Sequence, residues 1–153
     1  MHEANHWSTP FKHLPGGRGL VLDENTSPLT YAIIGAMQDI HSDMGPGFLE
    51  KSYQDAVEFA FNDRRIPFER EAAIPVAYRN RVLPTVYRAD FVCDGKVLVE
   101  LKAQTAMGAV EHAQIIHYLK ASRLPVGLLV NFGEASLVFR RFVGPVYTEQ
   151  LPI

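Results

Sequence analysis

The sequence predicts an α/β fold of mixed α+β character, in which helices flank a central mixed β-sheet. Two helix-like segments come first, three strand-like segments follow, and the chain then adds one more helix and two more strands. The run Val126–Phe132 is continuously apolar, which is typical of a strand covered on both faces. Because a helix separates this run from the strand that ends at Lys102, a right-handed crossover should make the two strands parallel.

The 153 residues are expected to form one domain with two loosely attached ends. Residues 1–26 hold several prolines and glycines without sustained periodicity, so we expect a disordered or loosely attached leader. Residues 27–143 carry the periodic segments and form the expected domain. Residues 144–153 contain proline and are expected to be a C-terminal tail.

The first two helices are expected at Ser27 to about Asp43 and at about Phe48 to Arg64, on either side of a Gly-Pro-Gly sequence. Glu50 falls in the first turn of the second helix, where the helix dipole favours a carboxylate. Tyr53 lies three residues further on the same face and could orient Glu50.

The remaining elements follow from alternation, turn residues and helical spacing. In the first strand Pro75 suggests an edge strand or a bulge. In the third helix Val110, Ala113 and Ile116 are expected to alternate between core and edge. The expected ranges are Phe68–Tyr78, Val82–Val92 and a strand ending at Lys102, then a helix at Gly108–Ala121, and strands at Val126–Phe132 and Ser136–Phe142.

Asp94-Gly95 predicts a hairpin turn between the second and third strands. A two-residue loop would leave Asp90 and Glu100 on opposite faces of the sheet. A three-residue loop, Cys93–Gly95, would pair Val92 with Lys96 and sort the side chains cleanly. We therefore expect the three-residue loop. One face would then be apolar, with Tyr87, Ala89 and Phe91 meeting Val97, Val99 and Leu101.

In this register Asp90 and Glu100 lie diagonally across neighbouring strands, about 5–8 Å apart, on the face opposite the core. Lys102 follows two residues beyond Glu100. Two carboxylates can hold one Mg²⁺ or Mn²⁺ ion, which keeps positions for water and a phosphate oxygen. A lysine beside them can orient the attacking water and offset charge on phosphorus. Ordinary charges on an exposed hairpin are the alternative interpretation.

Composition limits the function classes. A net charge of −2 and a pI near 6.3 argue against non-specific coating of nucleic acid, which usually requires a strongly basic surface. The single cysteine, Cys93, excludes an intramolecular disulfide and a cysteine-cluster metal site. No apolar run approaches the ~18 residues of a membrane span, so we expect a cytoplasmic protein without a membrane partner. Six arginines of the middle third should mostly form a solvated surface, with a groove as the alternative: Arg64, Arg65, Arg70, Arg79, Arg81 and Arg88.

With these residues placed, the sequence resembles the GxxExxY protein family, a branch of the PD-(D/E)XK nuclease superfamily. The naming motif stands here as Gly47-Phe48-Leu49-Glu50-Lys51-Ser52-Tyr53. Asp90 and Glu100-Leu101-Lys102 match the superfamily's hairpin motif, although Ala89 replaces its proline. Gln114 and Tyr118 are similar to the QxxxY element of RecB-type and lambda-type exonucleases. The resemblance covers roughly Leu29 to Arg141.

The resemblance implies a restriction-endonuclease-like core and roles for individual residues. Asp90, Glu100, the Leu101 carbonyl and Glu50 would hold Mg²⁺ or Mn²⁺, with Glu50 binding directly or through water. Lys102 would position and activate water. Gln114 and Tyr118 would hold the lysine, a water or a terminal phosphate, and Tyr53 would support Glu50.

The leading hypothesis is therefore a metal-dependent nuclease that hydrolyses phosphodiester bonds, of DNA in preference to RNA. The Gln114 and Tyr118 motif favours action at a free end or on a single strand. Because the domain is small, a partner or a homodimer is expected to supply further surface for a long duplex. Two alternatives stay open: a non-catalytic nucleic-acid or protein binding module on the same fold, and a hydrolase of small phosphoesters.

Overall fold

In the computed structural model, which describes residues 27–144, five strands form one mixed sheet in the order β1-β2-β3-β4-β5. The expected leader, and the tail from residue 145 on, lie outside the described residues. The elements are α2 (Ser27–Met44), α3 (Glu50–Asp63), β1 (Phe68–Tyr78), β2 (Arg81–Cys93), β3 (Val97–Lys102), α4 (Ala109–Ser122), β4 (Val126–Asn131) and β5 (Val138–Val143). The predicted fold class is confirmed.

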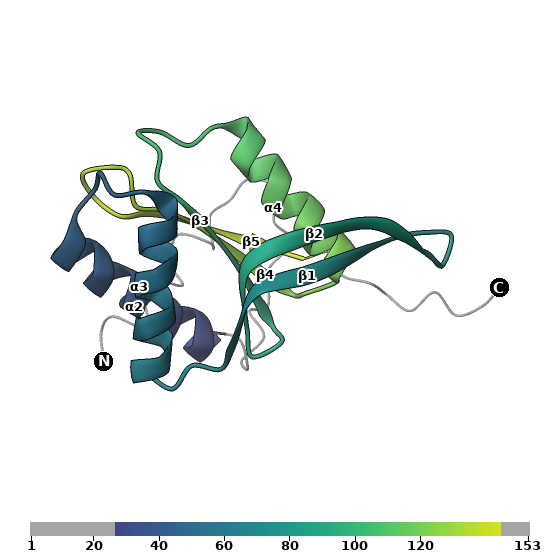
Figure 1. Ribbon diagram of the computed structural model, residues 1–153, viewed down its shortest axis with the longest axis horizontal. Coiled ribbons are helices and arrows are strands. Elements are labelled where there is room, and N and C mark those ends of the chain that lie inside the picture. Colours follow the sequence, from purple (N-terminus) through teal and green to yellow (C-terminus); the bar gives the residue numbers. More distant parts are fainter. Residues whose placement is uncertain (1–26, 145–153) are drawn as a thin grey trace.

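Helices cover both faces of the sheet (Figure 1). α2 and α3 pack on one face, where Ile33, Met37 and Phe61 join Val99 and Leu128 in the larger core. α4 packs on the other face over a smaller core. The strand between these layers, β4, is buried along its whole length, and it runs parallel to β3 as the crossover predicts.

α4 lies close to the sheet because β4 presents a glycine beneath it. A Cβ atom on Gly127 would come within 2.9 Å of Leu119 Cδ1 and 3.1 Å of Ile115 Cδ1. The helix therefore turns Ile115 and Leu119 toward the sheet. Val110 and Ile116, which we expected to alternate between core and edge, are instead 79% and 50% exposed.

Pro75 lies in β1, which is an edge strand, and the pairing of β1 with β2 also shifts register between Pro75 and Ala77. Both features allow a residue without a backbone N–H. The last part of β1 and the first part of β2 form an arm, residues 76–88, that extends beyond the rest of the sheet alongside α4 (Figure 1).

The hairpin between β2 and β3 has a different register from the one expected. Cys93 pairs with Val97 and Phe91 with Val99, so the expected pair of Val92 with Lys96 is wrong. Asp94 and Gly95 both have positive φ, as the central residues of a type I′ turn do, and Lys96 N–H donates to Cys93 O over 3.0 Å. Lys96 is therefore one extra residue between the turn and the paired strand.

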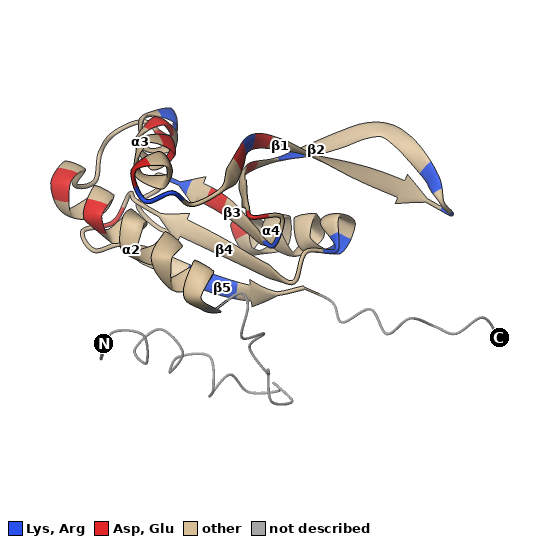
Figure 2. Ribbon diagram, turned by 90° about the horizontal axis from the view of Figure 1, so that it is seen from below, with Lys and Arg blue, Asp and Glu red and all other residues tan. Residues whose placement is uncertain are grey.

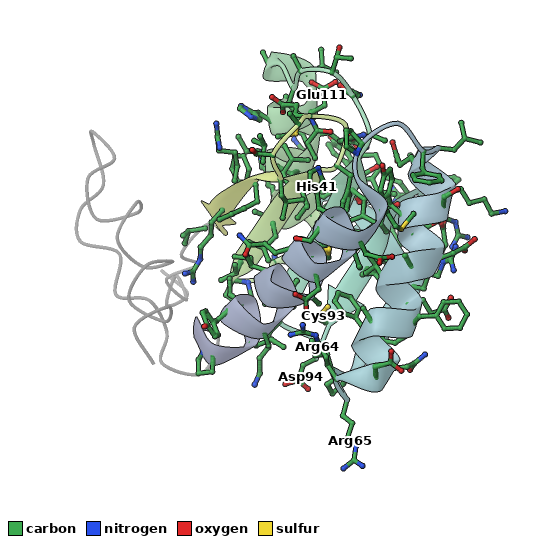
Figure 3. The ribbon with its side chains drawn as sticks, turned by 90° about the vertical axis from the view of Figure 1, so that its left-hand side faces the viewer. His41, Arg64, Arg65, Cys93, Asp94 and Glu111 are labelled. Carbon is green, nitrogen blue, oxygen red and sulfur yellow. The ribbon has the colours of Figure 1, made fainter. Side chains whose placement is uncertain are left out.

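The turn packs against the segment that follows α3. Asp94 N–H donates to Pro67 O over 2.9 Å, and Figure 3 shows Asp94 at this end of the molecule. Cys93, labelled in the same view, lies in the core behind α2 and α3. Burial raises the pKa of its thiol to about 12, so at neutral pH Cys93 behaves as a small apolar side chain.

Candidate active site

Asp90 on β2 and Glu100 on β3 replace backbone pairing between their strands with side-chain hydrogen bonds. The N–H of Asp90 donates to Glu100 Oε1 over 3.0 Å, and the N–H of Leu101 donates to Asp90 Oδ2 over 2.7 Å. The register of the hairpin, continued past Phe91 and Val99, sets Asp90 directly across from Glu100. The two carboxylates are thus opposite each other, and the diagonal arrangement that we expected is wrong.

The side chains of β2 change faces at Asp90. Phe91 packs in the core under α2 and α3, whereas Ala89 packs with Ile74 and Leu129 in the core under α4. The expectation that Tyr87, Ala89 and Phe91 share one apolar face is therefore wrong. The neighbouring strand shows the reason: Glu71 lies beside Asp90 in the register of β1 with β2 and has a φ of +52°. A left-handed residue within a strand changes the direction of its backbone, and it lies at the level where the side chains change faces.

Gln54 on α3 connects Glu71 of β1 with Asp90 of β2. Its Nε2 donates to Glu71 Oε1 over 2.6 Å and lies 3.4 Å from Asp90 Oδ1, and its Oε1 accepts a hydrogen bond of 3.1 Å from Arg70. Only 8% of Gln54 is exposed. Sequence reasoning missed both Gln54 and Glu71. The signal for Gln54 was its position four residues after Glu50, one turn along the same helix face.

Burial dominates the electrostatics of the carboxylate pair. Glu100 is only 4% exposed, and its burial, followed by the charge of Asp90, raises its pKa to about 8. Burial also raises the pKa of Asp90 to about 6, against the lowering effect of the Leu101 N–H, and the charges of Glu50 and Glu71 add to the increase. Two buried carboxylates with raised pKa values are a pair whose charged forms a cation would stabilise.

Lys102, at the end of β3, is held by α4. Its Nζ donates to Gln114 Oε1 over 3.1 Å, and Gln114 Nε2 donates to the Tyr118 hydroxyl over 3.0 Å. The ring of Tyr118 stacks on Tyr87 of β2 with the centroids 5.0 Å apart. The Gln114 amide therefore holds the Lys102 ammonium group at the end of β3 where the carboxylates lie. The amide is itself fixed by the stacked pair of Tyr118 and Tyr87.

Glu50 is the first residue of α3 and is exposed. Its charge contributes to the raised pKa values of both Asp90 and Glu100, so it lies within electrostatic range of the pair. Tyr53 does not orient Glu50 through its hydroxyl. That hydroxyl donates to Gly45 O over 2.5 Å and accepts from the Phe48 N–H over 3.3 Å, and the ring stacks on Phe132 at 4.5 Å.

Gly47 and Tyr53 thus share one structural task. Gly47 has a φ of +108°, a conformation that side chains rarely adopt, and Tyr53 ties the same loop to the core. Together they set the position at which α3 begins. The Gly-x-x-Glu-x-x-Tyr spacing therefore places Glu50 at the first position of α3.

The donor set fits Mg²⁺ or Mn²⁺ better than a softer ion. Asp90 and Glu100 supply carboxylate oxygens, and the Leu101 carbonyl belongs to the residue whose N–H binds Asp90. Within residues 27–144, no three His, Cys, Asp or Glu side chains form a ready metal cluster. A cation here would keep several waters, as Mg²⁺ does.

The family model of the PD-(D/E)XK nuclease superfamily matches residues 27–142. None of the curated proteins matches the sequence. Among solved structures, one described as "Crystal structure of SSO0001" is similar with a TM-score of 0.48 and 16% sequence identity, over 95% of this chain and 63% of that one. The chain thus spans less than two thirds of the length of that structure's chain.

Proposed function

Because the chain belongs to the PD-(D/E)XK nuclease superfamily, we propose that it is a metal-dependent nuclease that hydrolyses phosphodiester bonds in nucleic acid. One observation carries the proposal: the Asp90 and Glu100 carboxylates lie together at the end of β3, with the Lys102 ammonium held beside them by Gln114. A structural hairpin needs neither two buried acids nor a positioned lysine.

Asp90, Glu100 and the Leu101 carbonyl would hold Mg²⁺ or Mn²⁺, and Glu50 would bind it directly or through water. The ion, when bound, supplies Lewis-acid polarisation of the phosphate and lowers the pKa of water. Lys102 would orient a water for attack and offset negative charge on the phosphate oxygens. Gln114 keeps the ammonium in place, and Tyr118 keeps Gln114 in place.

The finer features of the proposal rest on the motifs. Gly47, Glu50 and Tyr53 support membership of the GxxExxY group, because the loop geometry gives Gly47 and Tyr53 a structural role and places Glu50 at the start of α3. Gln114 and Tyr118 resemble the QxxxY element of DNA exonucleases, which favours DNA over RNA and action at an end or on a single strand. A homodimer would extend the surface for longer substrates, and light scattering at several concentrations tests this.

Cleavage of end-labelled DNA and RNA, single- and double-stranded, tests the proposal in Mg²⁺, Mn²⁺ and EDTA. We expect cleavage only with a metal, and a loss of at least about 100-fold in Asp90→Asn and Lys102→Gln. Asp94→Asn and Lys96→Gln are the matched controls, because they make the same chemical changes at the hairpin turn and should keep full activity.

The same assay separates the alternatives. Metal-dependent hydrolysis of a small phosphodiester without cleavage of any polymer would indicate a small-molecule hydrolase. No hydrolysis, together with no Mn²⁺ binding by calorimetry, would contradict the nuclease and favour a binding module.

A further inference from the structure

A cavity of about 450 Å³ lies between the arm and α4. Tyr87 lines it from β2, and His117, Lys120 and Arg123 line it from α4 and the residue that follows it. Among the described residues that line it, none carries a carboxylate. Pockets of ~300–1,000 Å³ suit a ligand of small-molecule size, which is the scale of one nucleotide and much smaller than a duplex.

Both walls of this cavity belong to stretches of sequence without acidic residues. No Asp or Glu stands between Glu71 and Asp90, or between Glu111 and Glu134. The whole chain carries a net charge of −2, whereas these two stretches carry only positive charges. Figure 2 shows the basic side of this contrast, with blue segments at the tip of the arm and at the end of α4, whereas α2 and α3 carry several red segments. The basic residues of the two stretches are Arg79, Arg81, Arg88, Lys120 and Arg123.

The cavity is joined to the candidate active site through stacked and hydrogen-bonded side chains. Tyr87, in its wall, stacks on Tyr118, which accepts the hydrogen bond from Gln114, and Gln114 holds Lys102. Lys120 follows Gln114 by six residues, or about 9 Å along a helix that rises 1.5 Å per residue. The cationic side chains therefore begin within a short distance, on the scale of one or two nucleotides, of the lysine at the site.

We propose that the arm and α4 form a groove for one nucleic-acid strand, which we call the strand groove. This inference rests on the proposed nuclease function. Lys120, Arg123 and His117 contact the backbone phosphates next to the scissile one, and Tyr87 offers an aromatic surface. A positive groove beside an aromatic side chain is how proteins bind single strands without reading their sequence.

The tip of the arm extends the strand groove for longer substrates. Arg81 lies six residues before Tyr87 on β2, or about 20 Å along a strand that rises about 3.3 Å per residue. Arg79 lies near it in the turn, with its guanidinium 5.4 Å from the centre of the exposed Tyr78 ring. Short strands should therefore contact α4 alone, and long ones should reach the tip as well.

Fluorescence anisotropy in EDTA tests the strand groove apart from catalysis. The probes are labelled single-stranded DNA and RNA of about 4 and about 16 nucleotides, and a duplex of the longer sequence. We expect Lys120→Gln/Arg123→Gln to weaken single-strand binding about 10-fold and to reduce the salt slope by about 1.4, or about 0.7 for each lost phosphate contact. The control Lys96→Gln/Arg140→Gln changes the net charge equally on other exposed or half-exposed surfaces and should bind as wild type.

A second variant changes the arm, which lies opposite α4. The strand groove can therefore still be tested if the Lys120→Gln/Arg123→Gln variant fails to fold. Arg79→Gln/Arg81→Gln should weaken binding of the long strand and leave the short strand unaffected. Urea unfolding of each variant shows that the fold is kept.

An equal loss of affinity in the control, or tighter binding of the duplex than of the single strand, would overturn the strand groove. Comparison of DNA with RNA shows which polymer the groove prefers. Failure of the two proposals can be told apart: cleavage without any effect of the groove variants removes the groove alone, and groove-dependent binding without cleavage removes the nuclease alone.

Discussion

Asp90 and Glu100 each bind a backbone N–H of the other's strand: Asp90 N–H donates to Glu100, and Asp90 in turn accepts from Leu101, the neighbour of Glu100. In each carboxylate, one oxygen accepts a hydrogen bond from the backbone of the neighbouring strand. This bond fixes the orientation of the carboxylate, and with it the position of the second oxygen. Among the residues that the structure describes, no salt bridge joins either acid to a basic side chain. These two hydrogen bonds from backbone N–H groups to carboxylates therefore explain how a hairpin can keep two buried acids together.

The stability of the metal-free protein should fall as pH rises from about 4 to about 8. In the unfolded chain the carboxyl groups of Asp90 and Glu100 have ordinary pKa values of 3.8 and 4.5, whereas in the folded chain the pKa values are about 6 and about 8. The folded state therefore binds more protons in this interval, and the free energy of unfolding decreases as they are lost. Thermal unfolding in EDTA at several pH values measures the slope.

Glu100→Gln isolates this effect from other titrating groups. The variant should lose most of the slope, and the control Glu69→Gln, on an exposed part of β1, should keep it. Mg²⁺ or Mn²⁺ should stabilise the wild type more at pH 8 than at pH 5, because the ion competes with protons for the same oxygens. Equal slopes in wild type and Glu100→Gln would contradict the assignment.

The elements of the fold could be predicted because their signals are local. The bounds of β1 agree with the alternation that follows Pro67, and the helix between Lys102 and Val126 implies the parallel pairing of β3 with β4. Asp90, Glu100, Lys102 and Gln114 could be selected because residue type and order carry the motif, and the structure brings them to one place.

The register and the remaining polar residues of the site could not be predicted from local patterns. Lys96 adds a residue after a turn in which Asp94 and Gly95 are both left-handed, and alternation alone does not count such a residue. The faces of β1 and β2 change at the level of Glu71, which has a positive φ that a glutamate rarely adopts. Gln54 joins the site only because α3 packs across the sheet, which is a contact between distant parts of the chain.

Tyr53→Phe should destabilise the loop that precedes α3. The change removes the hydroxyl that donates to Gly45 O and accepts from Phe48 N–H, and keeps the ring that stacks on Phe132. We expect the free energy of unfolding to fall by about 1 kcal/mol, measured with urea. Tyr78→Phe, at an exposed position on the arm, should have no effect. Equal stabilities of the two variants would show that the loop is held by other contacts.

Asn131→Leu should lower the free energy of unfolding and should also loosen the segment that follows β3. The buried amide of Asn131 accepts from Gln104 N–H and Gly133 N–H and donates to Gln104 O, so it ties the residues after Lys102 to β4. Leucine leaves these backbone groups without a partner, at a cost of about 3 kcal/mol in urea unfolding. The exposed Asn62→Leu on α3 is the control, and a loss below about 0.5 kcal/mol at Asn131 would contradict this role.

Gln114→Leu should lower the rate of cleavage more than it lowers stability. Leucine has a similar size but cannot accept from Lys102 Nζ or donate to Tyr118, so the ammonium group loses its position while α4 keeps its packing on Gly127. We expect kcat to fall about 10- to 100-fold with the free energy of unfolding within about 1 kcal/mol of wild type.

Gln114→Glu separates positioning from packing, because a carboxylate still accepts from Lys102. It should therefore keep more of kcat than Gln114→Leu. The exposed Gln38→Leu on α2 is the control for a glutamine-to-leucine change. If Gln114→Leu and Gln114→Glu lose the same activity, the amide acts on α4 and not on Lys102, and the link between the helix and the lysine has to be given up.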